Sequence, residues 1–487
     1  MADIKARIPG FSSGPKYATL DTASSTVDIA DDDAPRDTPW GARNRRLLRI
    51  ATLTLAAALV AYMILTSGLG FDYASQPQKV STKLWGQYSP YFPVPSEIDS
   101  AVPEGCTITF AQVLSRHGAR DPTLYKTQIY NATLARIQKG ATKFGKGYEF
   151  LKDLEYTLGA DQLTAFGIEQ MLDQGREVAQ RYGHLAFVDN LPFIRASGQK
   201  RVIDSAENWA HGFYGELVAG DGGPVPDEEE YLGSILIVPE THGFNNTLDH
   251  GRCSQFEEGP ESQVGNHARN AFADKFTPPI LQRLHDNLGG DLALTRDDAI
   301  NIMDLCPFYT VANPNPQTNV SDFCHLFTHD EWKSYDYYQS LGKYYGYANG
   351  NPLGPTQGVG FVNELVARLT RRPVQDHTST NSTLTGSPDT FPLDRALYAD
   401  FSHDNTMLSI YAALGLYNLT EPLPRLDRTS PGKTEGFAAS WTVPFAGRMF
   451  VEKMTCSAEG EEELVRVIVN DRVVPLQGFK TFRFGCK

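Results

Sequence analysis

A run of 22 residues, 50–71, has no charged side chain and limits how the rest of the chain can be organised. A membrane-spanning helix needs about 20 apolar residues, so this run is long enough to cross a bilayer. Four arginines precede it, at Arg43, Arg45, Arg46 and Arg49. Positively charged flanks stay in the cytoplasm, whereas a cleaved signal peptide has a shorter leader and a shorter apolar core. We therefore expect an uncleaved signal anchor over residues 47–71 and a type II single-pass topology.

The segments on the two sides of this run differ in composition. Residues 1–46 are rich in Ser, Thr, Asp, Pro and Gly, cannot bury a core, and are expected to form a disordered cytoplasmic tail. Residues 72–83 resemble a short stem, and residues 84–487 form the globular part. That part is expected to be extracellular or lumenal, or secreted if the stem is clipped.

Sequons and cysteines agree with this topology because all of them follow the apolar run. The glycosylation sequons begin at Asn131, Asn245, Asn319, Asn381 and Asn418. The cysteines are Cys106, Cys253, Cys306, Cys324, Cys456 and Cys486. An even number of cysteines in an oxidising compartment indicates disulfides, but the spacing alone does not decide the pairing.

The net charge argues against one class of function. The formal net charge is −14, and residues 50–487 hold 36 basic and 51 acidic residues. Nucleic-acid binding requires a basic face, so we expect no nucleic-acid partner. An anionic substrate would need a local basic pocket to overcome the negative field of the whole domain.

Hydrophobic periodicity predicts strands over residues 107–114 and 396–401, and helices over residues 163–182 and 405–417. Strands that alternate with helices are typical of an α/β sheet. In such sheets, ligands bind just beyond the carboxyl ends of the strands.

The motif "RHGARDP" directly follows the first predicted strand. The forked guanidinium groups of Arg116 and Arg120 suit a phosphate group. Between them, His117 is a side chain that can act as a neutral nucleophile, and Gly118 permits close approach of the backbone to a ligand. The alternative is a solvated basic loop with a capping histidine, and local chemistry alone does not separate the two.

The motif "SHDN" occupies the same place after the second strand, before a predicted helix. A helix N-terminus favours anions, and Asp404 beside His403 could supply a proton. Asp404 could also serve only as a helix cap. The two junctions nevertheless offer complementary groups, a nucleophile with cations at one and a proton donor at the other.

Both motifs resemble those of a known family. "RHGARDP" is similar to the R-H-G-x-R-x-P signature of the histidine acid phosphatases, and "SHDN" to their His-Asp motif. Further stretches between residues 84 and 476 resemble fungal-type phytases in the same order: "LWGQYSPYF", "FAQVLSRHGAR", "IRASGQKRVIDSAENW", "FTHDEW", "GNPLGPTQGVG" and "NDRVVPL". The resemblance implies an α/β sandwich domain with a smaller α-helical domain inserted roughly between residues 210 and 385.

The resemblance also implies the activity and the roles of the residues. His117 would attack phosphorus and become a phosphohistidine, and Asp404 would protonate the leaving alkoxide. The phosphate oxygens would be held by Arg116, Arg120, Arg201 and His403. Arg201 matches the family better than Arg195 does. The expected enzyme is a monomeric acid phosphatase or 3-phytase that acts on myo-inositol hexakisphosphate (phytate) and other phosphomonoesters without a metal or organic cofactor.

Some positions depart from the family pattern. Asp121 stands where a tyrosine is common, and Gly147 and Gly342 stand where some phytases have substrate-contacting lysines. Lys152 and Lys343 remain as candidates for the rim of the substrate pocket. A less basic rim suggests broader and weaker substrate selection. Two alternatives therefore remain open, a general acid phosphatase with little preference for phytate and an inactive membrane-tethered protein that binds inositol phosphates.

Disulfide pairing also comes from the resemblance, which implies Cys106–Cys456 and Cys306–Cys324. The family's partner of Cys253 lies beyond the position where this sequence ends, and Phe479 replaces another family cysteine. Cys253–Cys486 is then the pair that remains.

Two further motifs carry little weight. "GFSSG" at residues 10–14 lies in the predicted disordered tail. His325 and His329 have a metal-binding spacing but lack the glutamate of H-E-x-x-H, and we expect no metal site.

Overall fold

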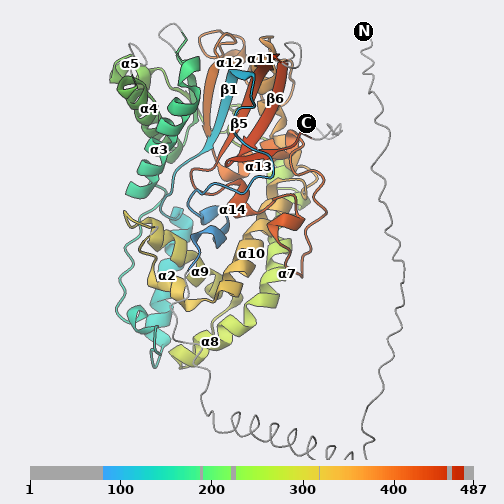
Figure 1. Ribbon diagram of the computed structural model, residues 1–487. Coiled ribbons are helices and arrows are strands. Elements are labelled where there is room, and N and C mark those ends of the chain that lie inside the picture. Colours follow the sequence, from blue (N-terminus) through green and yellow to red (C-terminus); the bar gives the residue numbers. More distant parts are fainter. Residues whose placement is uncertain (1–79, 187–189, 221–225, 317, 458–462, 477–487) are drawn as a thin grey trace, which may run out of the picture. The chain divides into compact units, whose positions relative to one another are not determined.

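The computed structural model describes residues 80–186, 190–220, 226–316, 318–457 and 463–476. They belong to one unit, residues 78–487 (Figure 1). The predicted tail and anchor, and most of the predicted stem, lie outside the described residues. Within those residues, no helix has the length and apolar character that a membrane span requires. The anchor therefore stays a prediction from the sequence.

A mixed sheet with strand order β3-β2-β4-β1-β5-β6-β7 forms the centre of the unit. Its strands are β1 (Cys106–Arg116), β2 (Phe193–Ser197), β3 (Leu236–Val238), β4 (Leu397–Ser402), β5 (Arg448–Cys456), β6 (Glu463–Val469) and β7 (Arg472–Val474). The pairs among β3, β2, β4 and β1 are parallel, and the pairs from β1 through β5 and β6 to β7 are antiparallel. The predicted α/β class and both predicted strands are confirmed.

The register of β1 and β4 determines where the two motifs lie. Arg116 is paired with Ser402 at the ends of these parallel strands. His117 and His403 are the next residues of the two chains, so both motifs leave the sheet at the same edge. Two stretches that are far apart in sequence thus meet where ligands bind in sheets of this kind.

The helices surround the sheet and extend beyond it. They are α2 (Leu124–Gly140), α3 (Ala165–Tyr182), α4 (Lys200–Ala219), α5 (Glu228–Gly233), α6 (Ser254–Glu257), α7 (Val264–Phe276), α8 (Pro278–Leu288), α9 (Arg296–Val311), α10 (His329–Tyr347), α11 (Val359–Thr370), α12 (Ser382–Thr385), α13 (Asp404–Ala413) and α14 (Ala439–Thr442). The two predicted helices form as α3 and α13. The first begins at Ala165, two residues later than predicted, because the Thr164 side chain accepts a hydrogen bond from Gly167 N and caps the helix.

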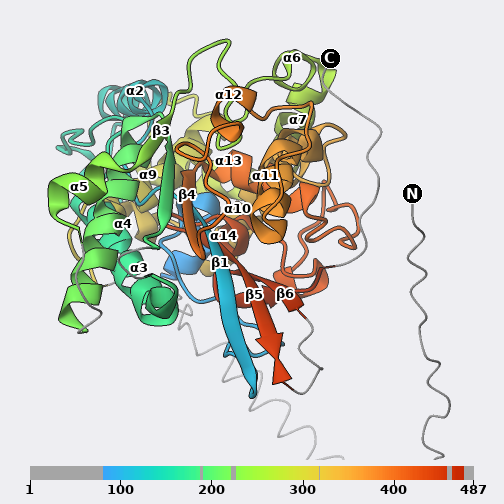
Figure 2. The ribbon, with the colours of Figure 1, turned by 90° about the horizontal axis from the view of Figure 1, so that it is seen from above.

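Two hydrophobic cores lie on opposite faces of the sheet. One core packs α3 and α4 against it and contains Val113, Trp209 and Phe401. The other is larger and joins the sheet to α2, α8, α9, α10 and α13. Figure 2 shows α3 and α4 on one side of the strands and α10, α11 and α13 on the other.

A group of helices, α2 and α7 to α10, extends away from the sheet (Figure 1). Helices α7 to α10 fall within the predicted insertion, 210–385, whose boundaries stay a prediction. Helix α2 comes from earlier in the chain and joins this group through Tyr130, whose hydroxyl donates to Asp304 on α9 at 2.7 Å.

Disulfides close both parts of the unit. Cys106–Cys456 links the start of β1 to the end of β5, and Cys306–Cys324 links α9 to the 3-10 helix η6 (Asp322–Leu326). Both pairs are those that the resemblance implied. Cys253 is also disulfide-bonded, and its predicted partner Cys486 lies outside the described residues.

Candidate active site

His117 is a buried, neutral imidazole at the end of β1, with 1% of its surface exposed. Its Nδ1 lies 2.8 Å from the carbonyl oxygen of Gly118, which can only accept a hydrogen bond, so Nδ1 carries the proton. Burial, followed by the charges of Arg116, Arg201 and Arg120, holds the pKa of His117 well below its usual value. The lone pair is therefore on Nε2, as a nucleophile requires.

Gly118 has a different role from the one predicted. A Cβ at Gly118 would lie 2.3 Å from the carbonyl oxygen of Gly167 in the first turn of α3. The missing side chain thus allows α3 to pack against the loop, rather than allowing a ligand to approach the backbone. The close approach of these two backbones fixes the loop that carries His117.

Three arginines, Arg116, Arg120 and Arg201, surround His117 closely enough to lower its pKa. In each of them Nε is buried and has no hydrogen-bond partner among the described residues. Buried donors are normally paired, so three unpaired guanidinium edges around one imidazole indicate an anion site.

The surroundings of Arg116 hold its guanidinium in place. Its NH1 donates to the carbonyl oxygens of Gln87 and Val443, the second at 2.8 Å, and its Cζ lies 4.6 Å from the ring centre of Phe445. Burial lowers the pKa of Arg116 to about 10. Arg116 therefore remains protonated at acid and neutral pH.

The other two arginines are anchored from different elements. Arg120 NH1 donates to the carbonyl oxygen of Asp121 at 2.7 Å. Arg201, on the first turn of α4, lies 3.4 Å from Asp161. Burial, and then the charge of Arg120, lower the pKa of Arg201 to about 10. A bound phosphate anion would relieve the repulsion between these two cations.

Asp404 is the first residue of α13, and it is ionised. Its Oδ2 lies 3.2 Å from Arg116 NH2 and 2.8 Å from the Nζ of Lys343. Burial by itself would raise the pKa of Asp404, but these two cations hold it well below its usual value. His403 is the N-cap residue of α13, so Asp404 does not serve as the helix cap.

Lys343 was predicted to lie at the rim of the pocket; it lines the cavity beside Asp404 and also pairs with Asp404 itself. Its Nζ donates to Asp404 at 2.8 Å and to the Oδ1 of Asn405 at 2.6 Å. No sequence signal places Lys343 against Asp404, because α10 and α13 are separated by about sixty residues and meet only in the fold.

His403 lies beside His117 and is held by an acidic residue that the sequence analysis missed. The two ring centres are 5.9 Å apart. His403 Nε2 lies 2.8 Å from the Oε1 of Glu240, which also accepts from Ser197 Oγ at 2.5 Å and from Gln199 N at 3.3 Å. Against the effect of burial, the bond to His403 lowers the pKa of Glu240 to about 2. Glu240 therefore orients the His403 ring as an anion.

Arg195 serves the structure instead of the site. It is buried and pairs with Asp400 and Glu364, each at 2.8 Å. Its Nε and NH2 groups donate to these carboxylates, and the charge of Arg195 helps to hold the pKa of Asp400 below its usual value against the effect of burial. This arrangement agrees with the preference for Arg201 as the phosphate-binding arginine.

Metal ligation has little support among the described residues. Glu240, Asp249 and His403 bring ligand-type atoms within 4.8 Å of one another, but the hydrogen bond between Glu240 and His403 already uses two of these atoms. His325 lies in η6 and His329 begins α10, so their spacing does not fall on one helical face. The expectation of no metal stays a prediction.

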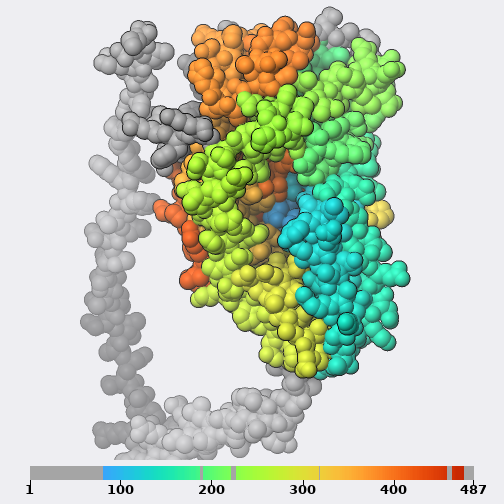
Figure 3. Space-filling model, turned by 180° about the vertical axis from the view of Figure 1, so that it is seen from behind, coloured from blue at the N-terminus to red at the C-terminus, as the bar shows by residue number. Residues whose placement is uncertain are grey.

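A cavity of 360 Å³ opens beside Asp404. Its lining includes Gln87, Arg269, Gly342, Lys343 and Asn405. Figure 3 shows a hollow with blue and orange segments at its floor and a yellow-green segment at its edge, which are the colours of these elements. Lys152, the other predicted rim lysine, is exposed at the end of the 3-10 helix η3 (Glu149–Leu151) and is not part of the lining.

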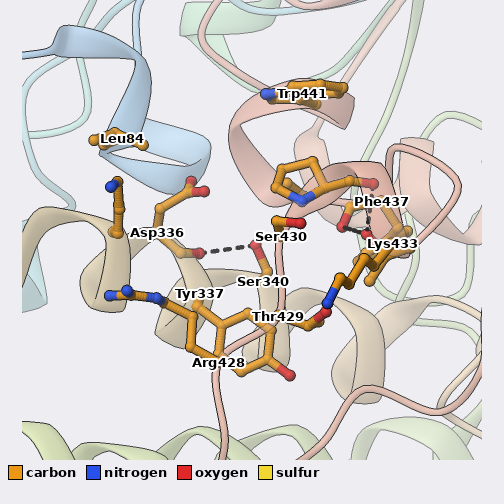
Figure 4. Close-up of a pocket in the computed structure, with 14 residues that line it drawn as sticks. Leu84, Asp336, Tyr337, Ser340, Arg428, Thr429, Ser430, Lys433, Phe437 and Trp441 are labelled. Atoms are coloured by element: carbon orange, nitrogen blue, oxygen red, sulfur yellow. Dashed lines mark hydrogen bonds between the residues drawn. The ribbon is translucent and has the colours of Figure 1, made fainter. Parts of the chain in front are cut away.

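A second cavity, of 530 Å³, lies between α10 and the segment around Trp441 (Figure 4). None of the predicted site residues lines it. Its floor includes Asp336, whose pKa burial raises to about 6 and whose Oδ1 accepts from Gly86 N at 3.1 Å. The exposed Lys433 lies at its edge.

Comparison with known proteins gives consistent matches. The model of the histidine phosphatase superfamily, branch 2, matches residues 107–470. Phytase A of Aspergillus fumigatus is 50% identical over 419 residues, which cover 85% of this chain and 88% of that protein. Phytase A of Emericella nidulans is 51% identical over 408 residues, which cover 82% and 85%.

Solved structures show the same fold at low sequence identity. The phytase from D. castellii has a TM-score of 0.64 and 20% identity, and the match covers 84% of each chain. The multiple inositol polyphosphate phosphatase of Bifidobacterium longum, in complex with inositol hexasulfate, has a TM-score of 0.54 and 16% identity, covering 81% of this chain and 93% of that one.

Proposed function

This chain belongs to the histidine phosphatase superfamily, branch 2, and on that premise we propose that it is an acid phosphomonoesterase of the 3-phytase type. Its substrates are phytate and other phosphomonoesters. The similarity to Phytase A proteins supports the substrate class. The observation that carries the chemistry is the neutral His117, with its lone pair on Nε2, among three arginines whose buried Nε atoms lack partners.

In the first step, Nε2 of His117 forms a bond to phosphorus while the ester P–O bond breaks. The electron pair of that bond goes to the alkoxide, which takes a proton from Asp404. Arg116, Arg120 and Arg201 neutralise the non-bridging oxygens, as phosphoryl transfer requires. The bond from Nδ1 to Gly118 fixes the ring orientation throughout.

In the second step, water attacks the phosphohistidine and gives its proton to the Asp404 carboxylate. The N–P bond breaks, its electron pair returns to Nε2, and inorganic phosphate leaves. The three arginines hold the phosphoryl group in both steps, so the same positive pocket serves both transition states.

Asp404 must gain a proton before it can act as an acid. A phosphate bound to Arg116 competes with Asp404 for that guanidinium and so raises the pKa of the carboxyl. At acid pH the substrate phosphate is a monoanion and brings a proton with it. The first effect lets Asp404 act as an acid at a higher pH than it could in the unliganded protein, and the second favours activity at acid pH.

The test is phosphate release by the purified full-length protein in mild detergent, across about pH 3 to 8. We expect hydrolysis of phytate and of p-nitrophenyl phosphate, with a phosphoenzyme trapped by rapid quenching into alkali, where the N–P bond is stable, and none of these with His117→Ala. A similar kcat/KM for both substrates would favour a general acid phosphatase. Binding of phytate without release of phosphate would favour the inactive binding protein.

We also propose that residues 47–71 anchor the enzyme as a type II membrane protein, with the phosphatase domain extracellular or lumenal. The support is the sequence: a charge-free run with arginines on its N-terminal flank, and sequons and cysteines that all follow it. Glycosylation at those sequons belongs to the same proposal.

A further inference from the structure

Arg269, on α7, lines the cavity beside Asp404 and forms no ion pair or hydrogen bond with another described residue. Its Nε is buried and unpaired. Its Cζ lies 5.6 Å from the ring centre of Tyr338. Contact with an aromatic ring holds a guanidinium in place and leaves its N–H edge free to bind a planar or tetrahedral anion.

The other charged groups of this cavity are already paired. The ammonium of Lys343 donates to Asp404 and Asn405. Glu257 is the one carboxylate in the lining, and its Oε1 lies 2.7 Å from Nδ1 of His250. The charge that remains for a ligand is therefore the positive charge of Arg269.

Gly342 makes room for this arginine. A Cβ at Gly342 would lie 3.1 Å from the Cδ of Arg269, closer than ordinary contact. A side chain at position 342 would require the arginine to shift by a few tenths of an ångström. The rim that looked less basic from the sequence thus carries a cation from a different helix, which changes the expectation of weak substrate selection.

The cavity borders residues of the phosphate pocket. Gln87 lines it, and the carbonyl oxygen of the same residue accepts from Arg116. Asn405 also lines it and directly follows Asp404. Its volume of 360 Å³ lies within the range of small-molecule sites. A ligand with one phosphate beside His117 can place another group in this cavity.

We propose that Arg269 binds a second phosphate group of the substrate and so selects inositol polyphosphates over simple monoesters. The inference rests on the proposed phosphatase function. Charge-assisted hydrogen bonds to a guanidinium are stronger than neutral ones, and a monoester with no second phosphate cannot form them. Arg269 is then a specificity residue and takes no part in the chemical steps at His117.

The test compares Arg269→Gln with the unchanged full-length enzyme. Loss of one charge-assisted contact should lower the ratio of kcat/KM for phytate to kcat/KM for p-nitrophenyl phosphate roughly tenfold to a hundredfold. Lys433→Gln removes the same charge from the edge of the second cavity (Figure 4) and should leave the ratio unchanged. A ratio that stays the same in Arg269→Gln would overturn the proposal.

Inhibition gives a readout that does not depend on phytate turnover. The assay measures inhibition of p-nitrophenyl phosphate hydrolysis by myo-inositol hexakissulfate and by inorganic phosphate. In Arg269→Gln, the inhibition constant of the hexakissulfate should rise more than that of inorganic phosphate. Gly342→Lys combined with Arg269→Ala should restore the lower value, because alanine has no Cδ to meet a side chain at position 342. If the wild-type enzyme fails to release phosphate from phytate and this shift still occurs, only the proposed substrate is wrong. If the two inhibition constants change together, Arg269 does not bind a second anionic group.

Discussion

The Nζ of Lys343 lies 2.8 Å from the Oδ2 of Asp404, so the group expected to donate a proton is held as a carboxylate in the unliganded protein. Arg116 contacts the same oxygen at 3.2 Å. Both cations must release part of their hold on this carboxyl before it can protonate a leaving group. Lys343 therefore influences the pH at which the enzyme works.

Replacing Lys343 with methionine should move the pH profile. Lys343 holds the pKa of Asp404 down, so its loss raises that pKa and keeps the acid protonated to a higher pH. The alkaline limb of kcat for phytate should shift to higher pH, whereas that for p-nitrophenyl phosphate should shift less. Lys333→Met, an exposed change on the same helix, serves as the control. An unshifted limb would show that Lys343 does not control this proton.

Asp404→Asn should act according to the leaving group. General-acid help is worth about 10²–10⁴-fold for a poor alkoxide leaving group, and much less for a nitrophenolate. The loss of kcat should be large with phytate and smaller with p-nitrophenyl phosphate, and a phosphohistidine should still be trapped. Equal losses on the two substrates would mean that Asp404 positions the phosphate instead of protonating the product.

Glu240→Gln should weaken phosphate binding through His403. The substitution keeps an oxygen acceptor for the ring but removes the negative charge that orients and stabilises it. Competitive inhibition by inorganic phosphate should weaken roughly threefold to tenfold. Ser197→Ala removes one donor to Glu240 and keeps the charge, so it should have a smaller effect. An unchanged inhibition constant in Glu240→Gln would rule out the positioning role.

Gly118→Ala and Gly215→Ala should change stability in opposite directions. A methyl group at Gly118 would meet the Gly167 carbonyl oxygen at 2.3 Å, and forced overpacking costs about 1–3 kcal/mol. Nothing lies within 4 Å of a Cβ at Gly215 in α4, where alanine should stabilise the helix by about 0.5–1 kcal/mol. Thermal melting should show a lower Tm for the first variant and a higher one for the second. A Tm for Gly118→Ala equal to that of the unchanged protein would mean that α3 can move away from the loop.

Topology can be tested in sealed microsomes. Positive flanks stay in the cytoplasm, so added protease should trim residues 1–46 and leave the phosphatase domain intact. Removal of N-glycans should then increase the mobility of the protected fragment. Protection of the tail would contradict the type II orientation.

The sequence by itself determined which residues the fold would bring to one edge of the sheet. Strand periodicity placed "RHGARDP" and "SHDN" directly after strands, and parallel strands in register deliver such motifs to the same edge. These signals are local, because a strand, its end and the turn that follows it are encoded within a few residues.

Tertiary structure alone decided the electrostatics of the site. The contacts of Asp404 with Lys343, His403 with Glu240 and Gly342 with Arg269 join residues from separate elements. Periodicity and motif spacing describe one element at a time and contain no information on which elements pack together. The charge state of the proton donor, the anchor of His403 and the cation beside Gly342 depend on distances of a few ångströms between elements, and these distances exist only after the helices have packed on the sheet.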